Sequence, residues 1–279
     1  MKKVIFTFLL VLTVISASGQ TRVNFHNEQS DTLRINEILA SNQRKSGGEL
    51  IESIARTFLG APYVAGTLEN NDTETLTINL DEFDCTTLVE TVMALAMTVN
   101  ERRQSWRDFV YNLQRIRYRG GQPDSYASRL HYISDWIIDN THRGNFREVT
   151  SASDLATYEV KTIDFMSSNR ELYPALADDA LFAAIKNVEI GYRSHRYPII
   201  KTGRIGKAMK SFLETGDIVA ITTGKKGLDV SHMGIIVDEK GVKHLLHASS
   251  AVGKVTIDKL PLDRYLTRHR HTGIRVIRL

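Results

Sequence analysis

The sequence of 279 residues contains a single cysteine, Cys85. One cysteine cannot close an intramolecular disulfide, so the stability of the fold has to come from a packed core. The thiol itself is then either an inert, small buried group or a group kept for its reactivity.

An excess of charge of one sign is also missing. Lys and Arg number 36 against 32 Asp and Glu, which gives a formal net charge of +4. The sequence has no dense Lys/Arg block and no interleaving of basic and aromatic residues, the pattern typical of nucleic-acid binding. We therefore expect no nucleic-acid partner, and nothing in the sequence indicates an obligate protein partner.

Long apolar runs are confined to the N-terminus. Met1-Lys2-Lys3 is followed by the apolar stretch Val4 to Ile15 and by the small residues Ser16-Ala17-Ser18-Gly19. This order predicts a signal peptide over residues 1–19, cleaved before Gln20, and an exported protein that is periplasmic or secreted. Its apolar run is shorter than the roughly 20 residues of a spanning helix, and no cysteine follows it, so we expect no stable membrane anchor.

The remaining residues, 20–279, have the length of one domain, and helical patterns precede strand patterns along them. This order predicts an α+β fold. Helical spacing occurs at 32–42, 49–59, 85–99, 106–117, 131–138 and 175–187, and strand patterns occur at 76–80, 217–222, 232–237, 243–247, 254–257 and 273–278. We expect the strands from 217 onward to form an antiparallel sheet, and region 105–201 to be a largely helical insertion that faces the substrate.

The surroundings of Cys85 favour reactivity over an inert thiol. Asp84 is a good helix N-cap, and the apolar residues between Leu88 and Val99 fit one helical face. Cys85 would then lie in the first helical turn, where unpaired N–H groups and the helix dipole stabilise a thiolate. We therefore expect a nucleophilic cysteine with a lowered pKa.

A nucleophilic thiol needs a base within hydrogen-bond reach and a third group that orients the base. The segment Ser231-His232-Met233-Gly234 places His232 at a strand start, and His247 lies on the next strand of a predicted hairpin. His244 is three residues before His247, so the alternation of a strand puts it on the opposite face. We expect His232 to be the base and His247 to orient it.

These segments resemble the NlpC-like cell-wall peptidases, which are papain-like cysteine hydrolases of peptidoglycan. The matching residues are Asp84-Cys85, Ser231-His232-Met233-Gly234-Ile235 and His247-Ala248-Ser249, together with Leu59-Gly60-Ala61-Pro62-Tyr63, which matches a loop with an active-site tyrosine. The resemblance implies a papain-like core in which N-terminal helices carrying the cysteine pack on an antiparallel sheet.

The chain also resembles a narrower branch, the N-acetylmuramoyl-L-alanine amidase-like group. This likeness rests on Phe83-Asp84-Cys85-Thr86-Thr87, Ser128-Arg129-Leu130-His131-Tyr132, Gly227-Leu228-Asp229-Val230-Ser231-His232 and His244-Leu245-Leu246-His247. Thr86-Thr87 replaces the Ser-Gly that follows the cysteine in the broader family, which favours the branch over the usual peptide specificity.

The branch implies hydrolysis of the amide between the lactyl group of N-acetylmuramic acid and L-alanine in peptidoglycan fragments, including anhydro-muropeptides, without a cofactor. Cys85 would attack the carbonyl, and the Cys85 N–H and the Tyr63 hydroxyl would stabilise the oxyanion. The motifs hold five further residues with expected roles. The sugar or stem peptide would be contacted by Arg129, His131 and Tyr132. The pocket would be shaped by Asp229 and Ser231.

Three other functions compete with this one. Cysteine and two histidines can bind zinc, although the sequence lacks closely spaced ligand pairs, so we expect no metal. A non-catalytic peptidoglycan-binding module would keep its function without Cys85. A γ-D-glutamyl–diamino acid endopeptidase, the commoner activity of the broader family, would leave Ala-Glu on the sugar, whereas an amidase releases a stem peptide that begins with alanine.

Overall fold

The computed structural model describes residues 23–69 and 73–279, so the predicted signal peptide lies outside the described residues. The helices are α1 (Glu28–Asn42), α2 (Gly47–Arg56), α3 (Cys85–Asn100), α4 (Trp106–Arg117), α5 (Ile133–His142), α6 (Phe165–Ser168), α7 (Asp179–Ile190), α8 (Ile205–Ser211) and α9 (Leu262–Arg268). The strands are β1 (Val23–Phe25), β2 (Leu76–Ile78), β3 (Arg147–Glu148), β4 (Thr157–Lys161), β5 (His195–Lys201), β6 (Ile218–Thr222), β7 (Val230–Glu239), β8 (Val242–Ser249), β9 (Lys254–Pro261) and β10 (Gly273–Arg278).

The main sheet has eight strands in the order β4-β5-β10-β6-β7-β8-β9, with β3 paired to β10. Its pairings are antiparallel, as the sequence predicts for the strands from 217 onward. A separate parallel pair joins β1 to β2. The mixture of helices with an antiparallel sheet is the predicted α+β architecture.

The β7–β8 hairpin forms where the sequence predicts it, with Glu239 opposite Val242. Its two turn residues, Lys240 and Gly241, have φ angles of 56° and 86°. Two successive positive φ angles are the signature of the turn that matches the natural twist of paired strands, and glycine adopts this conformation without strain. The turn therefore fixes the register that brings the start of β7 beside the end of β8.

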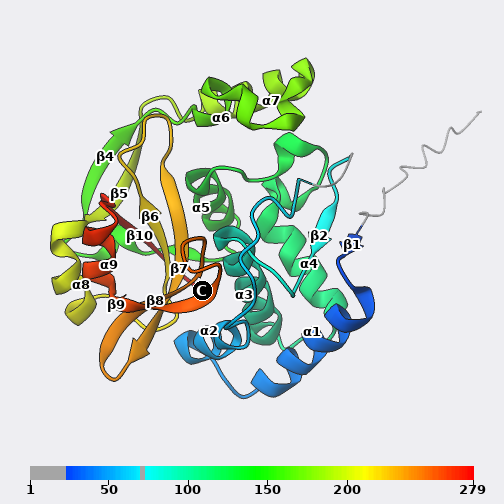
Figure 1. Cartoon of the computed structure of the whole chain (residues 1–279), viewed down its shortest axis with the longest axis vertical. Coiled ribbons are helices and arrows are strands. Elements are labelled where there is room, and N and C mark those ends of the chain that lie inside the picture. The colour runs from blue at the N-terminus through cyan, green and yellow to red at the C-terminus, as the bar shows by residue number, and fades with distance from the viewer. Residues whose placement is uncertain (1–22, 70–72) are drawn as a thin grey trace, which may run out of the picture.

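Helices cover both faces of the sheet (Figure 1). The N-terminal helices α1 to α4 bury one face through a core that includes Leu88, Met233 and Leu246. Helices α8 and α9 cover the other face through a second core that includes Ile236, Leu245 and Leu266. Strand alternation thus sends Leu246 to one core and its neighbour Leu245 to the other, which specifies the register strongly.

Helix α3 lies at the centre of the first core, and its burial exceeds the prediction. The sequence predicts one apolar face, but every residue from Thr87 to Val99 is buried. Glu90 is among them, and its Oε2 accepts a hydrogen bond of 2.6 Å from Nε of the equally buried Arg117. A buried carboxylate requires such a partner, because an unpaired charge would be strongly destabilising there.

Region 105–201 is more closely integrated into the domain than an insertion. Its helix α4 has the predicted bounds and buries Phe109, Leu113 and Ile116 in the same core as α3. The region also contributes β3, β4 and β5 to the main sheet, in addition to the expected helices.

Within the described residues, no helix is both long and apolar enough to cross a membrane.

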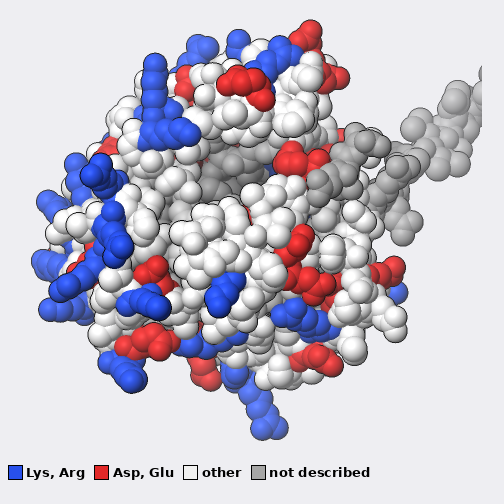
Figure 2. Space-filling view, in the orientation of Figure 1, with Lys and Arg blue, Asp and Glu red and all other residues white. Residues whose placement is uncertain are grey.

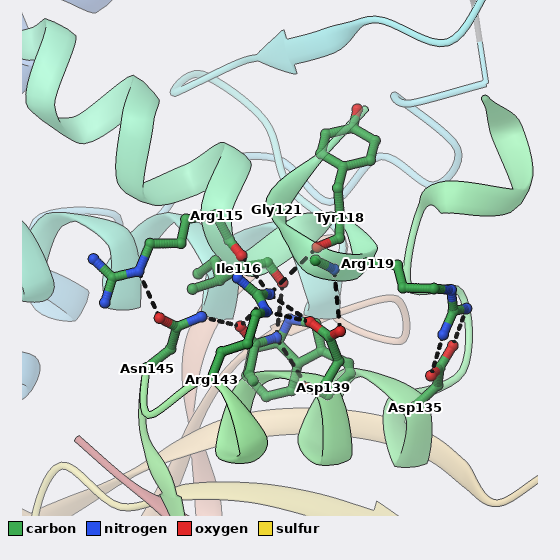
Figure 3. A network of polar contacts seen from close by, with 12 residues as sticks. Arg115, Ile116, Tyr118, Arg119, Gly121, Asp135, Asp139, Arg143 and Asn145 are labelled. Atoms are coloured by element: carbon green, nitrogen blue, oxygen red, sulfur yellow. Dashed lines mark hydrogen bonds and ion pairs between the residues drawn. The ribbon is translucent and has the colours of Figure 1, made fainter. Parts of the chain in front are cut away.

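A network of polar side chains ties α4 to α5 (Figure 3). The last carbonyl groups of a helix have no partner inside the helix, so other donors have to reach them. Here Asn140 Nδ2 donates to Ile116 O at 2.9 Å, and Arg143 Nη2 donates to Arg115 O at 2.6 Å. Arg143 is held in turn by Asp139 one helical turn before it. The C-terminal end of α4 is therefore capped by side chains from α5.

Candidate active site

The N-terminus of α3 is capped as the sequence predicts. Asp84 Oδ1 accepts hydrogen bonds from the backbone N–H groups of Thr86 at 3.0 Å and Thr87 at 2.8 Å. The Thr87 hydroxyl in turn accepts from the backbone N–H of Asp84 at 3.0 Å, which completes a capping box. Cys85 is therefore held at the first position of the helix.

The Cys85 thiol is adjacent to the start of β7. Its sulfur accepts a hydrogen bond from the backbone N–H of Met233, the residue that follows His232, and the Thr86 hydroxyl lies 3.9 Å away. Burial, with a smaller contribution from the Asp84 carboxylate, raises the pKa of Cys85 to about 11. This corrects the prediction of a lowered pKa: loss of hydration and a neighbouring negative charge outweigh the helix terminus.

Two histidines meet on the hairpin. His232 Nε2 and His247 Nδ1 are 2.6 Å apart, and the two rings are nearly perpendicular at 80°. His244 lies outside this pair, with its Nδ1 at 2.9 Å from the carbonyl oxygen of Asp258. The contact joins the two predicted partners, although the catalytic roles of Cys85, His232 and His247 stay predictions.

Both imidazoles are neutral at physiological pH. Burial lowers the pKa of His232 to about 3, and the neighbouring histidines His247, His271 and His269 contribute in the same direction. Burial also lowers the pKa of His247 to about 4, although the Asp258 carboxylate acts against it. At neutral pH the thiol of Cys85 and the imidazoles of His232 and His247 are therefore all uncharged.

A cavity of about 790 Å³ opens over the histidine pair. His232, His247 and the exposed Ser231 are among its lining residues, and so are several basic or titratable residues. The latter are Lys259, Arg268, His269 and His271, next to Asp258 and Tyr265. Cys85 is not among the lining residues. Tyr265 is among them, and Cys85 is close enough to this tyrosine to help raise the pKa of its phenol.

Tyr63 lies close to the cysteine, as the predicted oxyanion role requires. It forms an isolated parallel bridge with Phe83, two residues before Cys85. Burial, then the charges of Cys85 and Asp84, raise the pKa of its phenol. Tyr63 therefore keeps its proton at neutral pH and can donate a hydrogen bond.

The three predicted sugar or peptide contacts on 129–132 are engaged inside the protein. Arg129 is buried and pairs with Glu69 at 2.7 Å. His131 Nε2 is 2.8 Å from Tyr126 O, and burial lowers its pKa to about 3. Tyr132 is buried, with its hydroxyl donating to Glu189 Oε1 at 2.7 Å. These interactions hold the three side chains against the rest of the protein, and their contact with a sugar or stem peptide stays a prediction.

Asp229 and Ser231, the predicted pocket-shaping residues, lie in different surroundings. Asp229 is buried and its Oδ2 accepts the backbone N–H of Ser134 at 2.6 Å, whereas Oδ1 has no partner among the described residues. Ser231 is exposed at the cavity. Asp229 thus anchors the loop before β7 to α5, and only Ser231 reaches the cavity.

Sequence reasoning missed the residues that surround the histidine pair from β9 and α9. Asp258 Oδ2 lies 3.9 Å from His247 Nε2, and the Tyr265 ring lies 5.4 Å from the His247 ring. The rings of His269 and His271 pack on Tyr265 at 4.7 and 5.9 Å. The available signal was the run His269-Arg270-His271, which places two histidines within three residues; in the structure it forms a turn after α9, with Arg270 at a φ of 56°.

In the described parts of the chain, no group of three or more His, Cys, Asp or Glu side chains has an arrangement that could hold a metal ion. His232 and His247 are paired with each other, which occupies one nitrogen of each ring.

Comparisons with known proteins give one family model and several similar structures. A family model described as AmiA-like, N-acetylmuramoyl-L-alanine amidase-like, matches residues 53–274. An N-acetylmuramoyl-L-alanine amidase from Bacteroides uniformis is 41% identical, with a TM-score of 0.79 over 83% of this chain and 98% of its own. A Bacteroides fragilis protein provisionally named xylanase is 42% identical, with a TM-score of 0.77 over 81% of this chain and 100% of its own.

A Legionella pneumophila protein shares the fold at 22% identity, with a TM-score of 0.69 over 90% of this chain and 94% of its own. No curated protein matches the chain. The family match spans well over half of the sequence and includes Cys85, His232 and His247. The chain therefore belongs to the AmiA-like, N-acetylmuramoyl-L-alanine amidase-like family.

Proposed function

We propose that this protein is a cysteine amidase that hydrolyses the bond between N-acetylmuramic acid and L-alanine in peptidoglycan fragments. One observation carries the proposal: the only cysteine contacts the backbone N–H next to His232, whose Nε2 is 2.6 Å from His247. A thiol, a neutral imidazole and a group that orients the imidazole are the parts that nucleophilic acyl transfer needs. Membership of an amidase-like family supports the bond we assign.

The fold we propose is a papain-like core of the NlpC type. In support, α3 packs on the antiparallel sheet through Met233 and Leu246, and its N-terminal cysteine lies beside the strand that carries His232. Region 105–201 then extends this core with α4 and with strands added at the sheet edge.

In the proposed mechanism, Cys85 attacks the lactyl carbonyl carbon while its thiol proton passes to His232. Because burial keeps the thiol neutral, proton transfer accompanies attack instead of preceding it. His232 then returns the proton to the alanine nitrogen, the C–N bond breaks and a thioester remains. Water, deprotonated by the same imidazole, hydrolyses the thioester and restores the thiol.

The negative charge that develops on the carbonyl oxygen needs donors that are in place before the reaction. We assign this role to the Cys85 backbone N–H, which lies beside its own sulfur, and to the Tyr63 hydroxyl, which retains its proton. Asp84 occupies the neighbouring N–H groups of Thr86 and Thr87, so these do not contribute.

The cavity supports a small, acidic substrate. Stem peptides of peptidoglycan carry carboxylates, and the cavity lining includes Lys259 and Arg268 together with His269 and His271. Lys and Arg side chains also gather along the left side of the molecule in Figure 2, where α8 and α9 lie. Such a field attracts anionic fragments. We therefore propose soluble muropeptides, including anhydro forms, as substrates.

The name xylanase, carried by one relative, implies a different chemistry. Glycoside hydrolysis generally uses two carboxyl groups that flank the scissile bond. Asp258 is the only carboxylate among the residues that line the cavity, and its Oδ2 faces a histidine. The cavity residues therefore favour acyl transfer over glycoside hydrolysis.

We also propose that the protein is exported, because cell-wall fragments arise outside the cytoplasm. The proposal includes a cleaved signal peptide over residues 1–19 and a periplasmic or secreted mature protein. N-terminal sequencing of the protein recovered from its native compartment tests it. A mature chain that begins at Gln20 supports export, and an intact Met1 in a cytoplasmic fraction contradicts it.

The experiment that tests the activity is mass spectrometry of products after incubation with a defined anhydro-muropeptide. The wild type should release a stem peptide that begins with alanine, and Cys85→Ala should release none. His247→Ala should lower kcat, whereas the matched variant His142→Ala, which removes an exposed histidine at the end of α5, should not. Cleavage after the second stem residue would instead identify a γ-D-glutamyl–diamino acid endopeptidase. Binding without cleavage by wild type and Cys85→Ala alike would support the binding module.

A further inference from the structure

The contact between His232 and His247 joins two ring nitrogens, and a neutral ring carries one proton. At 2.6 Å, one of these nitrogens donates and the other accepts. If His232 Nε2 donates, His232 Nδ1 is a free lone pair and His247 carries its proton on Nε2. If His247 Nδ1 donates, the proton of His232 lies on Nδ1, and that nitrogen cannot accept a proton from a thiol.

The two arrangements differ at His247 Nε2, which is buried and has no hydrogen-bond partner among the described residues. The Asp258 carboxylate is the group that faces it, with Oδ2 at 3.9 Å. This distance is longer than a hydrogen bond, so the carboxylate acts through its charge. A negative oxygen attracts an N–H and repels a lone pair, which favours a proton on His247 Nε2.

The other groups packed against the pair carry no opposing preference of this kind. Tyr265 on α9 presents its ring, and the charged forms of His269 and His271 after α9 disfavour positive charge on the pair. Asp258, on β9, is the only carboxylate that acts on the pKa of His247, which it raises. The preference for one arrangement therefore depends on Asp258.

We propose that Asp258 is a positioning residue that sets the direction of the proton in the His232–His247 pair and so keeps Nδ1 of His232 available as the base. This inference rests on the proposed function and adds a fourth residue to it. During attack, the thiol proton moves to His232 Nδ1, His232 becomes an imidazolium, and no proton leaves Nε2. The His247 lone pair on Nδ1 and the Asp258 charge stabilise that imidazolium, and Asp258 itself stays ionised.

The test compares Asp258→Asn with Asp258→Glu. The asparagine amide can donate to His247 Nε2, so it favours the unproductive arrangement, whereas glutamate keeps the charge. We expect Asp258→Asn to lower kcat about 10- to 100-fold with KM within twofold, as is typical for residues that orient a reactive imidazole. The acidic limb of the pH–rate profile should also move to lower pH, because loss of the carboxylate lowers the pKa of His247.

Two matched controls make the comparison specific. Asp263→Asn removes one negative charge from the first turn of α9, outside the cavity lining, and should retain wild-type kcat. Asp258→Glu should recover at least part of the rate. Thermal melting identifies a variant that does not fold, in which case Asp258→Ser, a smaller neutral residue, replaces Asp258→Asn.

A readout that needs no substrate separates this inference from the proposed activity. Because the chain has one cysteine, alkylation by iodoacetamide reports on Cys85 alone, and nitrogen-15 NMR of the imidazoles reports on proton positions. Asp258→Asn should slow alkylation at pH 7 about tenfold and move the His232 proton from Nε2 to Nδ1. If both stay as in the wild type, the inference is overturned even when amidase activity is present. If both change although no muropeptide is cleaved, it stands and the proposed substrate is wrong.

Discussion

At the scale of single residues, Asp84 has two opposing effects on the candidate site. Its carboxylate caps α3 and so holds Cys85 in the first helical turn. Its charge, next to burial, also raises the pKa of the same thiol. The cap that positions the Cys85 thiol thus also makes it less acidic.

This conflict gives a prediction for Asp84→Asn. Asparagine is an equally good N-cap, so unfolding free energy should change by less than about 0.5 kcal/mol. Removal of the charge should lower the pKa of Cys85, seen as faster alkylation by iodoacetamide at pH 8. Asp84→Ala, the control, removes cap and charge together and should cost about 1 kcal/mol. An unchanged alkylation pH profile in Asp84→Asn would show that the carboxylate has no effect on the thiol.

The sequence was sufficient for residues whose role depends on local order, and insufficient for those that depend on long-range packing. Asp84 and the pair His232–His247 follow from a cap position and a hairpin. Asp258 was not predicted, because its approach to His247 depends on the pairing of β8 with β9 and on a bulge between His244 and Leu246. Arg129 was interpreted as a substrate contact, because its partner Glu69 lies 60 residues away in the sequence.

At the scale of elements, the junction of α4 and α5 shows how side chains complete a helix end. Asn140 and Arg143 supply the donors that the last carbonyl groups of α4 lack (Figure 3). The Arg143 guanidinium also places positive charge at the negative end of the helix dipole. Since α4 packs on α3, this junction supports the helix that carries Cys85.

We expect Arg143→Ala to lower the unfolding free energy by about 1–3 kcal/mol, because partly buried carbonyl groups lose their donor. Urea denaturation measures the change. Arg147→Ala, which removes an exposed arginine from β3, is the control and should stay within about 0.5 kcal/mol of the wild type. Equal midpoints for the two variants would mean that solvent replaces the cap without cost.

Elements with regular periodicity were predicted well, and edge elements were not. The bounds of α4 and β10 are those that the sequence predicts. The strands β4 and β5 were missed, because Tyr158 and Val160 are exposed on the edge strand and Pro198 interrupts its neighbour. Proline cannot donate to a ladder, so a segment that contains it reads as loop until its place near the edge is known.

At the scale of the whole molecule, burial of histidines makes stability depend on pH. Burial lowers the pKa of His131 and His232 to about 3 and that of His247 to about 4. The unfolded chain binds protons on these side chains below its ordinary pKa of about 6.5, whereas the folded chain does not until the pH falls to about 4. Between pH 6.5 and pH 4 only the unfolded state takes up these protons. The fold is therefore destabilised as the pH falls through this window.

We therefore expect the unfolding free energy to fall between pH 6.5 and pH 4, by at most about 1.4 kcal/mol per pH unit for each such histidine. The buried carboxyl groups Glu74 and Glu90, whose pKa burial raises, act in the opposite direction at acidic pH. A difference between two variants isolates the histidine contribution, because both share these carboxyl groups. His131→Gln serves this purpose, since it keeps a polar side chain beside Tyr126 and lies outside the histidine pair.

Urea denaturation of wild type and His131→Gln at pH 7.5, 6.5, 5.5 and 4.5 gives the measurement. At pH 7.5 the His131 imidazole is neutral in both the folded and the unfolded wild type. Any difference in unfolding free energy between the variant and the wild type at this pH therefore reflects packing alone. That difference should then shift in favour of the variant as the pH falls, because glutamine binds no proton in either state. A difference that stays constant over the series would show that His131 titrates normally in the folded protein, and that acid destabilisation arises elsewhere in the molecule.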